Sequence, residues 1–292
     1  MQQTKTKIRI CHDVVFKSIF LREKEALITM IKDITGISNK LSAEEIITGY
    51  ELEPYTIKGK VNKSDMLVII GENNYLNIEI NYKHEKNVIG RNLIQLFRIV
   101  NQTVESGMTD EEVSLKMVAQ LNINTFRNEN NKIIQKWILA DSDTGKELDY
   151  NIIKVWHFDI EKCYKMLYNN TNKIKNATRL ERWGALLYCS IDDIEQISKL
   201  LGDDLLTMEA KEKFIVRIKD ANSKDRIVQD WMVEENNRMR LAGQLAYAKD
   251  EGAEANKIEV IKAMLKKKLD YNTISEVTNK SIEEIKKIET SI

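Results

Sequence analysis

Two acidic residues in the first third of the chain lie next to short apolar runs. Asp65 opens the run Asp65–Ile70, and Glu79 lies within the run Tyr75–Tyr82. The residues between the two runs, Gly71-Glu72-Asn73-Asn74, favour a tight hairpin turn, so pairing of the runs would bring the two carboxylates together. Carboxylates at close range repel each other unless a cation lies between them, and their hard oxygens suit Mg²⁺ or Mn²⁺. A metal there would polarise a phosphate and lower the pKa of an attacking water.

Side chains alternate between the two faces of a strand, and the strand that holds Glu79 is polar on one face only. The polar face carries Asn77, Glu79, Asn81 and Lys83, whereas Ile78, Ile80 and Tyr82 share the other face. Asn81 or Lys83 could therefore orient the attacking water or stabilise charge on the phosphate. The same row also fits a solvated sheet face with an aspartate in a turn. Spacing alone favours that second interpretation, because short acidic pairs are common.

A basic segment follows this strand. Residues 88–105 have helical periodicity, with an apolar face and a polar stripe opposite it. The apolar face consists of Leu93, Leu96, Phe97, Val100 and Val104, and the stripe of Arg91, Gln95, Arg98 and Gln102. Together with Lys83, His84 and Lys86, the stripe forms a local basic patch that would hold DNA phosphates, since such contacts supply most of the sequence-independent affinity. The alternative is an ordinary solvated helix face.

The rest of the chain must supply the sheet and the helices that position these residues. Asp13 can cap a helix over residues 14–32, which Gly36 ends. Strands are predicted at residues 45–52, 65–70, 75–82, 113–123 and 152–160, with a short one at 136–140. Later residues predict helices only, at 180–187, 192–201, 209–220 and 227–248, followed by two or three short ones within 255–292. This order predicts an α/β fold in residues 1–160 and an all-helical C-terminal extension in residues 161–292.

The composition is that of a folded protein with a well-solvated surface. Hydrophobic residues make up 42% of the 292 residues and charged residues 31%, which excludes a disordered chain. Lys+Arg and Asp+Glu are equal at 45 each, so any binding of nucleic acid must come from a local patch.

Several classes of protein are disfavoured by what the chain lacks. No run approaches the roughly 18 apolar residues of a membrane span, and the N-terminus has no apolar stretch typical of a secretory signal. The three scattered cysteines fit free thiols in a reducing cytosol, so we expect a cytoplasmic protein without membrane contact. There is no glycine-rich phosphate loop, and the three histidines match no zinc spacing, so no small-molecule cofactor is expected.

The order of these features resembles that of the PD-(D/E)XK nucleases. Asp65, followed by an apolar hairpin and then Glu79-Ile80-Asn81, is similar to their D…(D/E)-x-K core. More narrowly, the chain resembles the branch of transposase-like, recombination-promoting (Rpn-like) nucleases. The other matching segments are Asp13 to Lys17, Glu51-Leu52-Glu53-Pro54, Arg91 with Gly107, Arg182-Trp183, residues 245–252 and the tail from Met264. None of these motifs is specific by itself, but their order is, and the resemblance covers nearly the whole chain.

The resemblance implies a restriction-endonuclease-like mixed sheet flanked by helices. It also implies a Mg²⁺- or Mn²⁺-dependent DNA endonuclease linked to mobile elements, recombination or phage defence. Asp65 and Glu79 would be metal ligands, with the carbonyl of Ile80 as a third. Asp13 either approaches the same site from the first helix or is a plain N-cap.

Asn81 departs from the family pattern. The superfamily has Lys at this position and the branch has Gln, so catalytic competence depends on whether Lys83, on the same strand face, compensates. Lys17 and Arg91 would contact phosphate, and Gln95 lies on the same helix stripe. If the substitution has removed activity, the fold would instead serve as a protein-binding or oligomerisation module.

The C-terminal helices predict self-association. The helix over residues 227–248 is polar on most of its surface, and such a helix needs a partner. The helices after residue 255 are too short to persist alone in water. Their apolar side chains must therefore pack on one another or on a second chain: Ile258, Ile261, Met264, Leu265, Ile274, Val277, Ile285 and Ile288. This tail resembles a small helix-turn-helix, but its glutamates disfavour DNA contact, so a homo-oligomer is expected.

Overall fold

The computed structural model describes residues 7–37, 43–48, 51–52, 62–70, 74–82, 87–104, 107–114, 117–126, 131–147, 153–223 and 225–290. The chain forms two compact units, Met1–Val228 and Gln229–Ile292. No helix in the described ranges combines the length and the apolar character that crossing a membrane requires.

A six-stranded mixed sheet is the centre of the first unit, with the strand order β1-β4-β5-β6-β8-β7. Its strands are β1 (Ala43–Thr48), β4 (Met66–Ile70), β5 (Asn74–Asn81), β6 (Met117–Asn124), β7 (Ile134–Ile138) and β8 (Ile153–Asp159). The β5–β6 and β6–β8 pairs are parallel, and the other neighbours are antiparallel. The helices α3 (Val88–Thr103) and α4 (Asp110–Ser114) connect the parallel strands β5 and β6. The predicted mixed sheet with flanking helices is confirmed.

Two predicted strands differ in extent from those observed. The run 45–52 is divided, because β2 (Glu51–Leu52) pairs with β3 (Asn62–Lys63) in a separate two-stranded ribbon. The run 113–123 begins as the short helix α4, and only residues from Met117 onward join the sheet. Both predicted runs contain enough apolar residues to look continuous, although a change of partner or of element interrupts them.

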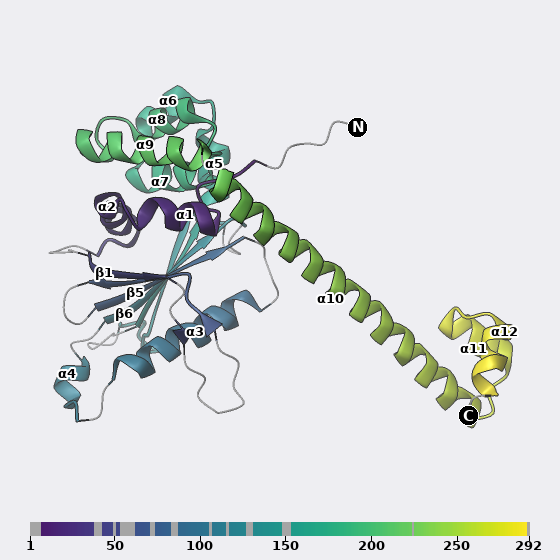
Figure 1. Ribbon diagram of the computed structural model, residues 1–292. Coiled ribbons are helices and arrows are strands. Elements are labelled where there is room, and N and C mark those ends of the chain that lie inside the picture. Colours follow the sequence, from purple (N-terminus) through teal and green to yellow (C-terminus); the bar gives the residue numbers. More distant parts are fainter. Residues whose placement is uncertain are drawn as a thin grey trace. The chain divides into compact units, whose positions relative to one another are not determined.

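The two faces of the sheet pack against different helices (Figure 1). One face is covered by α1 (Asp13–Phe20), α2 (Lys24–Thr35), α5 (Ile160–Leu167) and α7 (Arg179–Tyr188). The helices α6 (Thr171–Asn176), α8 (Ile194–Leu201) and α9 (Met208–Ser223) pack on these helices and extend the same core. This main core extends from Ile10 to Ile218 and includes Leu76 and Ile78 of β5. The opposite face packs against α3 through a smaller core that includes Leu67, Leu96 and Val118.

The first compact unit continues past residue 160, the predicted end of the nuclease-like core, through α9 to Val228. The helices beyond residue 160 contribute fully buried side chains to the main core, among them Trp183 and Phe214. The narrower prediction, that residues 1–160 by themselves make the nuclease-like core, stays a prediction.

The N-terminal helix predicted over residues 14–32 is two helices. The chain leaves helical geometry between Phe20 and Lys24, so α1 and α2 bury separate apolar faces in the main core. No proline or glycine marks this break in the sequence. Gly36 ends α2 as predicted, with a left-handed φ of 66° that suits glycine.

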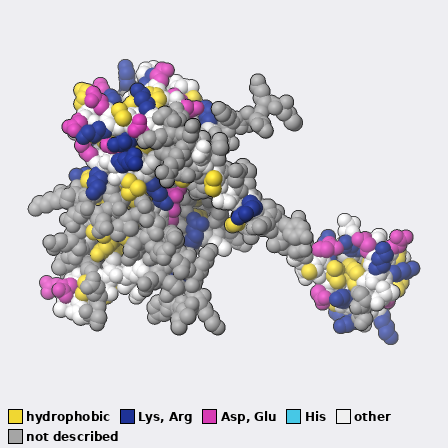
Figure 2. Space-filling view, in the orientation of Figure 1, with side chains coloured by type: hydrophobic (Ala, Val, Ile, Leu, Met, Phe, Trp, Pro, Cys, Tyr) yellow, Lys and Arg dark blue, Asp and Glu magenta, His cyan; other side chains and the backbone are white. Residues whose placement is uncertain are grey.

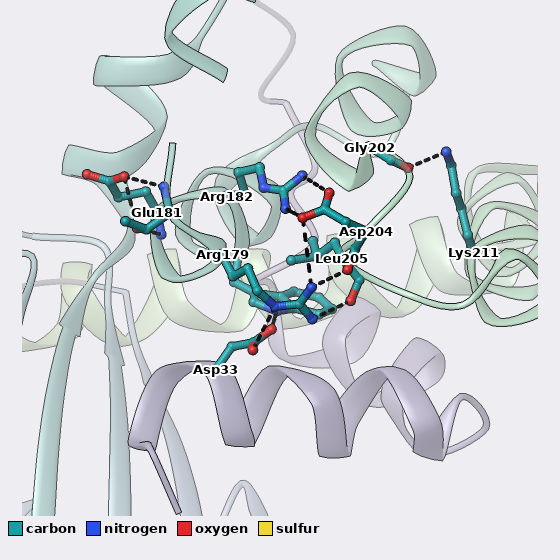
Figure 3. A network of polar contacts seen from close by, with 10 residues as sticks. Asp33, Arg179, Glu181, Arg182, Gly202, Asp204, Leu205 and Lys211 are labelled. Carbon is teal, nitrogen blue, oxygen red and sulfur yellow. Dashed lines mark hydrogen bonds and ion pairs between the residues drawn. The ribbon is translucent and has the colours of Figure 1, made fainter. Parts of the chain in front are cut away.

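A partly exposed polar network joins α2 to the later helices (Figure 3). Asp33 of α2 accepts hydrogen bonds from Arg179 Nε at 2.9 Å and from Trp183 Nε1 at 2.7 Å. Arg182, which is buried, forms a two-pronged ion pair with Asp204. Charge-assisted hydrogen bonds of this kind fix geometry as well as contributing energy, so α7 is held against α2 and the segment before α9.

The three cysteines lie buried in the first unit and form no disulfide, as predicted. Burial raises the pKa of the Cys11 thiol to about 12. A thiol that stays protonated is a weak nucleophile, so Cys11 is a core residue and has no reactive role.

The second unit is a small helical module. It contains most of the long helix α10 (Asp225–Lys266), together with α11 (Tyr271–Thr278) and α12 (Ile282–Glu289). Ile261, Ile274 and Ile285 are fully buried together, so the terminal helices pack on one another and on the end of α10. Val277, predicted to be buried, is 64% exposed. On the face of this unit that Figure 2 shows, both acidic and basic side chains are present.

Gly184 provides a test of the packing between α7 and its neighbours. A Cβ at this position would lie 2.5 Å from Cys163 Sγ and 2.8 Å from Phe158 Cζ. We expect Gly184→Ala to destabilise the first unit by about 1–3 kcal/mol, because overpacking forces the neighbours to shift. The measurement is thermal unfolding, with Gly252→Ala as the control, since nothing lies within 4 Å of a Cβ built at that residue. An unchanged melting temperature for Gly184→Ala would contradict this packing.

Candidate active site

Asp65 and Glu79 lie side by side across the β4–β5 hairpin. Met66 pairs with Ile78, which places Asp65 opposite Glu79 at the end of the antiparallel ladder. Asp65 Oδ2 accepts a hydrogen bond from the Ile80 backbone N–H at 2.9 Å, and Glu79 Oε1 accepts one from the Asp65 N–H at 3.3 Å. Each carboxylate is therefore oriented by the other strand's backbone, and the predicted approach of the two residues is observed.

Two buried polar residues support Glu79. Asn77 Nδ2 donates to Glu79 Oε1 at 3.1 Å, and Ser64 Oγ donates in turn to Asn77 Oδ1. Asn77 and Ser64 are almost completely inaccessible to solvent. The alternation of polar residues along β5 pointed to Asn77, whereas nothing in the sequence distinguished Ser64 as its partner.

Burial and mutual repulsion disfavour the charged forms of both carboxyl groups. Burial raises the pKa of Glu79 to about 8, the neighbouring Asp65 adds to this effect, and Arg91 opposes it. Burial also raises the pKa of Asp65 to about 6, with a further contribution from the charge of Asp13, while Lys17 and Arg91 oppose it. A divalent cation between the two groups would replace the proton that Glu79 otherwise retains at neutral pH.

Asp13 and Lys17 of α1 lie at the edge of this pair. The N-cap position of α1 is His12, so the N-cap interpretation of Asp13, the first residue of the helix, is wrong. Its carboxylate pairs instead with Lys17 Nζ at 2.7 Å and 2.8 Å, and its charge acts on Asp65. Among the described residues, no three Asp, Glu, His or Cys side chains are grouped closely enough to hold a metal ion. Because the charge of Asp13 acts on Asp65, Asp13 lies near the pair, and its part in the site stays a prediction.

The donor chemistry fits a hard divalent cation. Two adjacent carboxylates and the carbonyl of Ile80, whose N–H already binds Asp65, would supply oxygen ligands only. Mg²⁺ commonly takes one or two carboxylates and keeps several waters, so it does not need a fully protein-lined cage. The residues present therefore suit Mg²⁺ or Mn²⁺.

Asn81 is engaged in a network of amides at the end of β5. Its Oδ1 accepts hydrogen bonds from Arg91 Nη2 at 3.1 Å and from Asn92 Nδ2 at 3.2 Å, and its Nδ2 donates to Asn124 Oδ1 at 2.9 Å. Asn92 Nδ2 also donates to Asn122 Oδ1 at 2.7 Å. Lys83, predicted to share this face, lies outside the described residues.

The polar row continues across the parallel strands. Glu79 is in register with Asn122 of β6, which is in register with His157 of β8, and all three are buried. Asn81, Asn124 and Asp159 form the next row. The sheet face beneath the first half of α3 is thus lined with amides and titratable groups.

This polar floor explains why the predicted faces of α3 are partly wrong. Gln95, expected on the solvated stripe, is 4% exposed, whereas Phe97, expected in the core, is 54% exposed. Asn92 and Gln95 turn toward the polar part of the sheet, and Leu96 and Ile99 cover the apolar part. Arg91 remains exposed at the site, and Arg98 is half-buried.

Sequence reasoning missed Asn92, Asn122 and Asn124. The alternation Gln120-Leu121-Asn122-Ile123-Asn124 was a usable signal, because it is the same one-sided pattern that singled out Glu79 and Asn81. Only the parallel register of β5 and β6 reveals that the two polar faces are neighbours.

The family model of the PD-(D/E)XK nuclease family transposases matches residues 10–223. This match covers well over half of the chain and ends with the last residue of α9, so the chain belongs to that family. No curated protein and no solved structure matches the chain. Membership confirms the predicted superfamily and transposase-like branch, and with them a nuclease-like protein of the α/β PD-(D/E)XK fold with a helical C-terminal extension.

The raised pKa of Glu79 predicts a stability that depends on pH. In the unfolded chain this carboxyl ionises near pH 4.5, but in the folded, metal-free protein it holds its proton to about pH 8. The contribution of protonated Glu79 to the free energy of unfolding is therefore fully present below pH 4.5, and it is lost as the pH rises toward 8. We expect Glu79→Gln to melt at a higher temperature than wild type at pH 8, and the difference to disappear near pH 4.5. The exposed Glu212→Gln is the control. Equal melting temperatures at pH 8 would contradict the burial of an ionisable Glu79.

Proposed function

We propose that this chain hydrolyses phosphodiester bonds in DNA with a divalent metal ion, Mg²⁺ or Mn²⁺, held by Asp65, Glu79 and the carbonyl of Ile80. The observation that carries the proposal is the pair of cross-braced carboxylates, with Glu79 buried and Asp65 half-buried, each with a raised pKa. When bound, the metal ion would polarise the phosphate and activate water. Family membership supports a nuclease-like role and is consistent with work in mobile elements, recombination or phage defence.

The protein's own groups would bind and orient the substrate. Asn77 keeps one Glu79 oxygen directed along the strand, and the Ile80 N–H does the same for Asp65. Arg91 and Lys17 are the described cations whose charges act on Asp65, so they are proposed to contact the phosphate. Gln95 is buried, and its proposed part is limited to seating α3 on the sheet. Water orientation by Lys83 stays a proposal for a residue outside the described ranges.

A second candidate function rests on Asn81. This position carries a neutral amide whose oxygen and nitrogen are both engaged by protein groups. Under this alternative, the protein has lost its nuclease activity, and the fold serves as a protein-binding or oligomerisation module. A plasmid-nicking assay separates the two candidate functions, because only the first predicts metal-dependent cleavage.

We also propose that the chain forms a homo-oligomer through its C-terminal helices. The support is apolar surface that no described residue covers: Val233 and Leu241 of α10 are 60% and 57% exposed, and Val277 of α11 is 64% exposed. A second chain packed on α10 and α11 would remove these side chains from water.

Nicking of supercoiled plasmid tests the proposed chemistry. Wild type should nick with Mg²⁺ or Mn²⁺ and stop when EDTA is added. Asp65→Asn and Glu79→Gln should each lower the rate at least about 100-fold, because they remove charge from the site but preserve shape. The exposed Glu212→Gln should cleave like wild type. Cleavage that survives EDTA, or an undiminished rate in both site variants, would rule out this metal site.

Light scattering tests the proposed assembly. The full chain should have at least twice the mass of the 33.9 kDa protomer, whereas a chain ending at Val228 should be monomeric, because it lacks the second unit. Circular dichroism on the shortened chain would verify that the first unit is folded. An identical oligomeric state in both chains would show that the C-terminal helices are not the assembly element.

A further inference from the structure

The side chain of Asn81 binds the guanidinium group of Arg91. A guanidinium group can only donate hydrogen bonds, so the Asn81 atom that faces Arg91 must be the oxygen. That oxygen accepts from both Arg91 Nη2 and Asn92 Nδ2, which uses its two lone pairs. The Asn81 amide nitrogen faces Asn124 Oδ1. With both ends engaged in this way, the side chain is poorly placed to orient a water molecule.

Arg91 donates hydrogen bonds to two asparagines and remains exposed to solvent. Besides its bond to Asn81, its Nε donates to Asn92 Oδ1 at 3.4 Å. Asn81 and Asn92 are 3% and 2% exposed, whereas Arg91 is an exposed residue. A buried pair of asparagines on β5 and α3 therefore presents a charged group to solvent.

The guanidinium lies next to the proposed metal ligands. Asn81 and Glu79 are two residues apart on the same face of β5, which corresponds to about 6.7 Å along the strand. Arg91 touches Asn81, so its charge lies within reach of a phosphate bound beside Glu79. In agreement with this position, the charge of Arg91 lowers the pKa of both Asp65 and Glu79.

We propose that Arg91 is the cation that neutralises charge on the scissile phosphate, and that Asn81 and Asn92 are positioning residues that hold its guanidinium there. This inference rests on the proposed nuclease function and deepens it. Negative charge on the phosphoryl oxygens must be balanced during displacement, and a cation held in advance does so without reorganisation. Arginine suits the task because its planar fork matches phosphate geometry and it stays charged at all relevant pH values.

The test moves the positive charge from α3 to β5. The variants are Arg91→Gln, Asn81→Lys and the double variant, with Arg22→Gln as an exposed control between α1 and α2. Single-turnover cleavage of a duplex with Mn²⁺ and calorimetric Mn²⁺ affinity are measured for each.

Arg91→Gln should cleave at least about 30-fold more slowly, yet bind Mn²⁺ at least about threefold more tightly, because a like charge beside the metal is removed. Asn81→Lys alone should also cleave slowly, since it breaks the clamp and places two cations together. The double variant should cleave at least about tenfold faster than Arg91→Gln, because it regains one cation at the site. A residue that only maintained the fold would give neither the tighter Mn²⁺ binding nor the recovery.

The outcomes separate the inference from the function on which it rests. If wild type cleaves and Arg91→Gln cleaves equally fast, the inference is wrong and the proposed function stands. A double variant no faster than Arg91→Gln also overturns the inference. If wild type does not cleave at all, the proposed function fails. Mn²⁺ affinity then decides the position of the charge: tighter binding by Arg91→Gln supports it, and unchanged or weaker binding refutes it.

Discussion

The arrangement of the site depends on two carboxylates that the β4–β5 hairpin holds together, Glu79 buried and Asp65 half-buried. Asp65 and Glu79 each accept a hydrogen bond from the backbone of the opposite strand, so the two carboxyl groups are oriented side by side. Their raised pKa values reflect the free-energy cost of placing two charged carboxylates side by side with little access to water. An arrangement that is unfavourable for the protein alone becomes favourable with a divalent cation between the groups, and this is the physical basis of the proposed nuclease chemistry.

In the first unit, one face of the sheet carries the main hydrophobic core, and the opposite face carries the candidate active site. The main core lies between one face and the helices α1, α2 and α5–α9, and it contains nearly all of the largest buried side chains. The opposite face carries a smaller apolar core where Leu67, Val118 and Val155 meet Leu96 and Ile99 of α3. That contact anchors the helix, so its first half can lie over a polar floor and bring Arg91 to the carboxylates.

Local patterns in the sequence were sufficient for the hairpin and for the approach of Asp65 to Glu79, because the turn and the alternation both lie within one short segment. They failed where a neighbour decides the outcome. The periodicity of α3 placed Phe97 inside and Gln95 outside, on the assumption that an apolar surface lies beneath a helix. The amide floor comes from Asn122 and Asn124, and its position depends on a parallel register that no local pattern encodes. The break between α1 and α2 contains no glycine or proline, so no local sequence signal predicted it.

The central claim is that Asp65 and Glu79 share one divalent cation, and anomalous diffraction from crystals grown with Mn²⁺ tests it most directly. We expect a single strong manganese peak at about 2.0–2.4 Å from an oxygen of each carboxylate and from the carbonyl of Ile80. In that state the Glu79 oxygen that now accepts from the Asp65 N–H should have turned to the metal. A peak elsewhere, or none while Glu79 keeps its hydrogen bond to Asp65, would contradict the claim.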